Sequence, residues 1–253
     1  MKYLLLIVLL PFLYGSCQNE GTTTSNAVDY GNPAAEGFNA TDSDEKAIAL
    51  ADEVMEAMGG RKNWDDTKFL VWNFFGSRKH YWNKKTGDIR IESIKDSTTY
   101  LMNIHTMKGK VKIGDTELTE PDTLKKLLTN GKSMWINDAY WLVMPFKLKD
   151  SGVTLKYIGQ DTSQTNAEVL ELTFKNVGDT PDNKYLVSVD KSSKLVNQWA
   201  FYGNYDDPAP RFTMPWLDYA IFGKVKLSGN RGRMKLTEID VPERLDEGLF
   251  TKF

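Results

Sequence analysis

Cys17 is the only cysteine in a chain of 253 residues, and its position determines what its thiol can do. It follows Lys2, an apolar run over residues 3–13, and the small residues Gly15 and Ser16. A membrane-spanning helix needs about 20 apolar residues, so this run is too short to cross a bilayer. A basic start, a short apolar run and small residues at its end are typical of a cleavable secretory signal. Residues 1–16 are therefore predicted to be a signal peptide with Cys17 at the cleavage point.

The end of this signal resembles a bacterial lipobox, although Tyr14 stands where the lipobox usually has leucine. The resemblance implies that the Cys17 thiol is acylated with fatty chains such as palmitate and that Cys17 becomes the new N-terminus. Three acyl chains would anchor the protein far more firmly than a single myristoyl chain does. We therefore expect a lipid-anchored protein of the cell envelope, at the outer membrane of a Gram-negative bacterium. The alternative is ordinary secretion with a free thiol.

Composition indicates one domain and argues against a nucleic-acid partner. The chain is 41% hydrophobic and 12% aromatic, which is enough for a sizeable core, and its net charge is only −2. Without a basic field, no nucleic-acid partner is expected. Residues 17–43 are poor in large apolar side chains and are predicted to be a flexible tether. Residues 44–253 are predicted to form a single β-rich domain, and we expect a monomer.

The other chemically capable residues lack the partners that catalysis needs. His80 and His105 both fall on expected strands, without a Gly-x-Ser-x-Gly nucleophile elbow and without His-x-His or His-Glu-x-x-His zinc spacing. The acidic pairs at 65–66 and 206–207 sit in turn-like contexts, where carboxylates more often cap and solvate than cleave glycosides. We therefore predict a protein that is not an enzyme and has no catalytic residue, metal or cofactor.

Two helical regions are expected between the strands. Asp42 and Glu45 have the spacing of a capping box at the start of a helix, which Gly59-Gly60 ends. Pro121 is suited to a first helical position, and Asn130-Gly131 is expected to end that helix before a second stretch over residues 132–142.

Short alternating runs bounded by polar turns predict antiparallel strands through the rest of the domain. They cover residues 69–75, 89–92, 100–104, 110–113, 153–158, 170–174, 185–189, 195–201, 221–227 and 234–241. The predicted fold class is therefore α+β, mainly antiparallel β, with about eleven strands around an N-terminal helix and a central helical insertion.

This order of elements resembles the half-open barrel of the periplasmic lipoprotein carriers LolA and LolB and of related mycobacterial envelope lipoproteins. The opening from Met58-Gly59-Gly60 through Trp64 to the first long strand is similar to the way such domains begin. The segment 135–148, Trp-Ile-Asn-Asp-Ala-Tyr-Trp-Leu-Val-Met-Pro-Phe-Lys-Leu, resembles more closely a set of uncharacterised Bacteroidota lipoproteins. The resemblance implies a curved open sheet that wraps helices and leaves an apolar cavity, but fold alone does not establish function.

Four of the seven tryptophans lie in apolar contexts on expected strands and on the helical insertion: Trp72, Trp135, Trp141 and Trp199. They are the candidate lining of a cavity for an apolar ligand, such as an acyl chain or a lipoprotein segment. The alternative is that these rings fill the interior of a structural or interaction lipoprotein. A third hypothesis is a hydrolase of an unrecognised kind, which convergent histidine and carboxylate groups in the cavity would favour.

The lipid anchor can be tested with Cys17→Ser. Because the substitution removes the thiol that is acylated, the protein should move from the membrane fraction to the soluble fraction, and labelled fatty acid should no longer be incorporated. Fatty-acid labelling of the variant, or its retention on membranes after a salt wash, would show that Cys17 is not the anchor.

Overall fold

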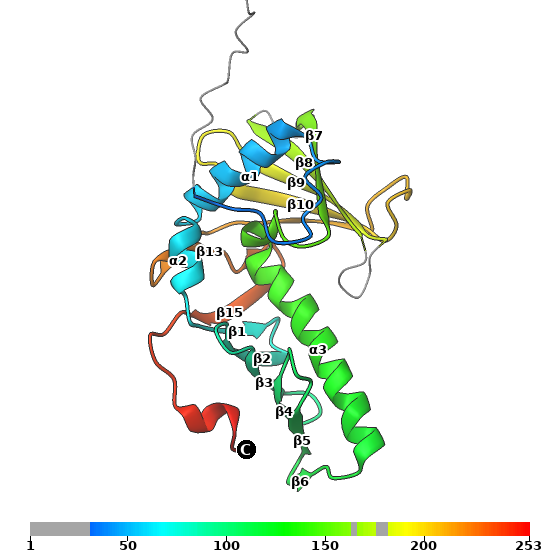
Figure 1. Ribbon diagram of the computed structural model, residues 1–253, viewed down its shortest axis with the longest axis vertical. Coiled ribbons are helices and arrows are strands. Elements are labelled where there is room, and N and C mark those ends of the chain that lie inside the picture. The colour runs from blue at the N-terminus through cyan, green and yellow to red at the C-terminus, as the bar shows by residue number, and fades with distance from the viewer. Residues whose placement is uncertain (1–30, 163–165, 176–181) are drawn as a thin grey trace, which may run out of the picture.

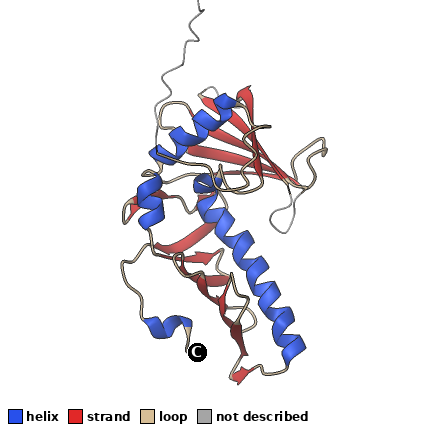
Figure 2. Cartoon of the chain, viewed as in Figure 1, coloured by secondary structure: helices blue, strands red, loops and turns tan. Residues whose placement is uncertain are grey.

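The computed structural model describes residues 31–162, 166–175 and 182–253. The predicted signal peptide lies outside these residues, as do Cys17 and the rest of the predicted tether up to residue 30. Within the described residues, the chain forms two main antiparallel sheets, a two-stranded hairpin and three α-helices (Figures 1 and 2).

The larger sheet has eight strands, and six of them, β1 to β6, follow one another in sequence. Its spatial order is β14 (Asn230–Arg231), β15 (Met234–Asp240), β1 (Phe69–Phe74), β2 (Arg78–Asn83), β3 (Asp88–Ser93), β4 (Thr98–Asn103), β5 (Gly109–Ile113) and β6 (Thr116–Glu117). Strand register aligns one row of side chains across β1–β5: Trp72, His80, Ile91, Tyr100 and Val111. These side chains are all buried, so this row belongs to the core face of the sheet.

The smaller sheet is a five-stranded meander. Its order is β11 (Phe212–Pro215), β10 (Val196–Tyr202), β9 (Lys184–Asp190), β8 (Ala167–Phe174) and β7 (Val153–Gln160). A separate hairpin joins β12 (Ala220–Phe222) to β13 (Val225–Leu227). The row Leu155, Leu172, Tyr185 and Phe201 lies on the face of this sheet that meets the shared core.

Helix α1 (Glu45–Ala57) covers the five-stranded sheet, and α2 (Arg61–Asp66) follows it after Gly59-Gly60. Helix α3 (Pro121–Val143) continues into the 3-10 helix η1 (Met144–Lys147), and a second 3-10 helix, η2 (Glu247–Phe250), lies near the C-terminus. Figure 1 shows α3 running beside β1–β5, with its C-terminal end beneath the five-stranded sheet. One helix therefore contributes to both halves of the core.

The prediction that Asn130-Gly131 ends a helix is wrong. Pro121 is the first residue of α3 and Glu120 caps it by accepting from the Asp122 and Thr123 amides, but the helix runs on through Gly131. A Cβ on Gly131 would lie 3.0 Å from the Tyr100 ring and 3.2 Å from the Met102 sulfur. Glycine therefore allows the helix to pack closely on β4, rather than ending it.

Residues 31–43 belong to the folded domain, contrary to the expectation of a flexible tether up to residue 43. Asn32 is buried and its side-chain amide donates to Asp52 at 2.7 Å. Backbone hydrogen bonds join this segment to the β7 region: Ala35 N to Lys149 O (2.9 Å), Gly152 N to Gly37 O (2.8 Å) and Asn39 N to Val153 O (3.0 Å). The segment is polar but pairs its backbone with its neighbours, which composition cannot show.

The helix start is also displaced from its predicted position. Asp44, not Asp42, is the N-cap of α1, and its carboxylate accepts from the Tyr157 amide at 2.9 Å rather than from its own helix. The cap residue therefore joins α1 to β7.

The class predicted from sequence, α+β with mainly antiparallel strands in an open sheet, is confirmed. The strands divide into two main sheets instead of one sheet of about eleven, and the run expected over residues 221–227 is the hairpin β12–β13.

A buried charge network joins α3 to the larger sheet. The Asp138 carboxylate is fully buried and accepts two hydrogen bonds from Arg78, at 2.6 and 2.9 Å, and one from His80 Nε2 at 2.7 Å. Although burial raises the pKa of Asp138, the bonds from His80 and Arg78 bring it below its ordinary value. Burial lowers the pKa of His80, which keeps its ring neutral at pH 7.

Asp138→Asn should destabilise the protein by about 3–5 kcal/mol, because breaking a buried ion pair leaves its partners uncompensated. The measurement is denaturant unfolding at pH 7, with Asp66→Asn as the matched control. Asp66 pairs with Lys62 on the surface, so its variant should unfold almost as the wild type does. Equal effects of the two substitutions would show that the buried network is not what secures α3.

Candidate ligand-binding pocket

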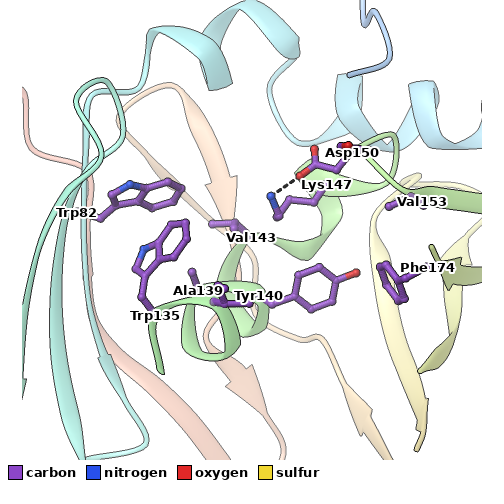
Figure 3. Close-up of a pocket in the computed structure, with 11 residues that line it drawn as sticks. Trp82, Trp135, Ala139, Tyr140, Val143, Lys147, Asp150, Val153 and Phe174 are labelled. Atoms are coloured by element: carbon purple, nitrogen blue, oxygen red, sulfur yellow. Dashed lines mark hydrogen bonds and ion pairs between the residues drawn. The ribbon is translucent and has the colours of Figure 1, made fainter. Parts of the chain in front are cut away.

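A pocket of about 240 Å³ lies where α3 meets both sheets. Its lining comes from β2, α3, η1, the turn before β7, and β7 and β8 (Figure 3). The lining residues are predominantly apolar: Trp82, Trp135, Ile136, Ala139, Tyr140, Val143, Lys147, Asp150, Ser151, Val153 and Phe174. Concave apolar pockets with a few polar groups are the usual form of small-molecule sites.

Trp82 and Trp135 form one wall of the pocket. Their ring centroids are 5.0 Å apart and the planes meet at 75°, which is an edge-to-face contact. Trp82 stands two residues after His80 on β2, so both side chains lie on the core-facing side of that strand. This places the Trp82 ring at the pocket. Trp135, Ala139 and Val143 follow one another at intervals of four residues, so they lie along one face of α3.

The polar groups of the pocket come from another side. Figure 3 shows Lys147 and Asp150, which form an ion pair, lying apart from Trp82 and Trp135. Ser151 also lines the pocket. The Tyr140 hydroxyl is buried and has no hydrogen-bond partner within the described part of the chain, and burial raises its pKa well above the ordinary value. The pocket thus has an aromatic wall and a polar end.

An aromatic strip extends from the pocket along the five-stranded sheet. Tyr140 and Phe174 line the pocket and contact Tyr185, with centroids 5.5 and 5.8 Å apart. The ring contacts continue at 5.1 to 5.4 Å through a series of partly exposed side chains: Tyr185, Phe201, Phe212, Trp141 and Phe75. We call these seven residues the aromatic strip.

The four tryptophans predicted to line one cavity occupy three environments. Trp135 lines the pocket. Trp141 lies in the aromatic strip, with Trp199 packed beside it at 4.8 Å but almost fully buried. Trp72 is fully buried and stacks on His80 at 4.5 Å. Trp82 was not predicted to line the cavity. Its position two residues after His80 places it on the same face of the strand, and this spacing could have identified it.

The other candidates do not come together at the pocket. His80 is buried in the Asp138 network, and His105 lies in an exposed turn after β4, not on a strand. Asp65 and Asp66 form ion pairs within α2, and Asp207 accepts the Asn204 amide in a turn. Across the described ranges, no group of three or more histidine, cysteine or acidic residues could hold a metal ion. Nor is any of the described helices long and apolar enough to cross a membrane.

Arg231 holds the end of α3 behind the aromatic strip. Its guanidinium is fully buried, donates to the Trp141 carbonyl at 2.6 Å and lies 3.4 Å from the centre of the Trp216 ring. The other Nη hydrogens are donated to Ser228 Oγ, Ser228 O and Asn230 O at 3.0 to 3.1 Å, while the buried Nε has no hydrogen-bond partner within the described part of the chain. Burial lowers the pKa of Arg231 to about 9. The cation therefore satisfies carbonyl groups at a helix C-terminus, where positive charge is favourable.

Comparisons with known proteins do not assign the chain to a family. No family model and no curated protein matches it. Among solved structures, it is similar to a DUF1329 family protein from Desulfovibrio piger, with 12% sequence identity and a TM-score of 0.44. The match covers 81% of this chain and 96% of the other.

Trp135→Ala should cost less stability than Trp199→Ala. Removing a fully packed tryptophan costs about 3–5 kcal/mol, which is the expectation for Trp199. Trp135 is partly exposed and faces a pocket, so it has fewer neighbours to lose. Denaturant unfolding of both variants measures the difference. Equal losses at the two positions would indicate that Trp135 is packed as closely as the core.

Proposed function

We propose that the protein is a non-enzymatic, lipid-anchored envelope protein that binds or shields an apolar ligand in the pocket between its two sheets. The observation that supports this most is the open pocket lined by Trp82, Trp135 and Tyr140 and continued by the aromatic strip. Its volume of about 240 Å³ is slightly below the roughly 300–1,000 Å³ of typical ligand pockets. One segment of a ligand, such as part of an acyl chain, would occupy the pocket while the remainder lay along the strip.

The proposal includes the likeness to carrier-type half-barrels. The two open sheets share one core around α1 and α3, as expected of a sheet that wraps helices and leaves an apolar space. In the same proposal, Cys17 carries the acyl anchor, the protein lies at the outer membrane as a monomer, and its ligand is an acyl chain or a segment of another lipoprotein. The structural alternative is an interaction lipoprotein in which the strip only completes the core.

A neutral apolar probe, N-phenyl-1-naphthylamine, tests this proposal on the full chain after lipid extraction. Binding should increase probe fluorescence and quench tryptophan emission, because Trp82 and Trp135 line the pocket. Ala139→Leu should weaken binding at least about tenfold, since the added carbons occupy pocket volume.

Thr129→Leu is the control, because it adds a leucine on an exposed position of the same helix. It should bind the probe as the wild type does. Absence of probe binding to a folded, lipid-free protein would favour the filled interior and the structural alternative. Native mass spectrometry of the protein before extraction should detect a co-purified lipid.

A further inference from the structure

The pocket has a direction, because its two tryptophans lie apart from its charged residues. Trp82, Trp135, Ala139 and Val143 come from β2 and the C-terminal half of α3, whereas Lys147, Asp150 and Ser151 come from η1 and the turn before β7. Figure 3 shows Lys147 and Asp150 apart from Trp82 and Trp135, with Val143 between them. An amphiphilic ligand would therefore bind in one orientation, with its chain at the tryptophans and its head at Lys147.

Positive charge is in excess around this polar end. Lys84 follows Trp82 by two residues, and its ammonium lies 4.6 Å from the centre of the Trp64 ring. The same Trp64 ring stacks on Phe146 at 4.2 Å, and Phe146 precedes Lys147. Burial, to which three neighbouring cations add, lowers the pKa of Lys84 to about 8; these cations are Lys85, Arg61 and Lys147. These three basic groups therefore lie within electrostatic reach of Lys84.

The carboxylates nearby balance only part of this charge. Asp65 pairs with Arg61 at 2.8 Å, and Asp150 pairs with Lys147. Lys84 and Lys85 have only the Asp65 carbonyl as a hydrogen-bond acceptor, at 3.4 and 2.6 Å, and form no ion pair within the described ranges. An incoming anion would thus meet a positive field next to an apolar pocket.

We infer that the pocket selects single-chain amphiphiles with an anionic head, which is held at Lys147 while the chain lies against the wall formed by Trp82 and Trp135. This rests on the proposed function and names the ligand class of the same site. Asp150 then competes with the ligand head, because its carboxylate already pairs with the Lys147 ammonium. Removing the Asp150 carboxylate should strengthen ligand binding, and removing the Lys147 ammonium should weaken ligand binding.

The test measures displacement of N-phenyl-1-naphthylamine from the full chain by three probes of equal chain length, namely dodecanoate, dodecanol and dodecyltrimethylammonium, each below its micellar concentration. Dodecanoate should bind at least about fivefold more tightly than the cationic probe, and high salt should reduce the difference. Lys147→Gln should weaken dodecanoate binding about fivefold and Asp150→Asn should strengthen it by a similar factor. Dodecanol carries no charge, so either variant should change its binding less than it changes that of dodecanoate.

Lys147→Arg and Lys110→Gln are the controls. The first keeps the cation and should keep the preference, and the second removes an exposed lysine of β5 that lies outside this pocket. If all three probes bind equally, or if Lys147→Gln leaves dodecanoate binding unchanged, the charge selection is wrong while the apolar site stands. If none of the three displaces the naphthylamine, the inference fails, and if the naphthylamine does not bind, the proposed function fails with it.

Discussion

The position of α3 depends on the buried carboxylate of Asp138. Arg78 and His80 both point from β2 toward it, so the helix has one rotation in which all three hydrogen bonds form. Successive residues of an α-helix are separated by about 100°, and a small rotation of α3 would therefore move Trp135, Ala139 and Val143 together. Because these three residues line the pocket, the ion network in one half of the core sets the shape of the site in the middle of the molecule.

The C-terminal end of α3, in the turn that follows Asp138, is held by a cation in a different environment. Arg78 faces a carboxylate, but Arg231 is surrounded by carbonyl oxygens and the face of Trp216. A carbonyl near the C-terminal end of a helix lacks its usual intrahelical partner and carries part of the negative end of the helix dipole. Arg231 satisfies such a carbonyl at Trp141, directly beside Tyr140 of the pocket. The half-buried Arg78 and the buried Arg231 therefore hold the C-terminal third of one helix, at Asp138 and at Trp141.

Features that depend on local interactions could be predicted from the sequence, and features that depend on distant residues could not. Alternating runs such as residues 89–92 and 234–241 predicted strands well, because side-chain alternation is a property of each strand alone. The division into two sheets depends on which strands pair, and β15 pairs with β1 across more than half of the chain. Gly131 was misread because its reason for being glycine lies on β4 and not in its own helix.

The same distinction applies to the pocket. Trp135, in a motif rich in aromatic residues, lines the pocket, but Trp72 has the same local signature and lies on His80 in the core. Local pattern identifies large apolar side chains and does not show which of them remain beside open space. His80 appeared unpartnered in sequence since its carboxylate partner, Asp138, lies 58 residues away on another element.

Protein interiors normally close spaces larger than a water molecule, so the persistence of this pocket needs a physical cause. Its walls are rigid rings: Trp82 and Trp135 meet edge to face, and neither can fold into the space as a flexible aliphatic chain would. Collapse would instead require α3 to move, and the helix is held by Asp138 on one side and by Arg231 near its end. The free-energy cost of keeping the site open is therefore met when the protein folds and not when the ligand binds. A ligand that enters has little of the protein to reorder.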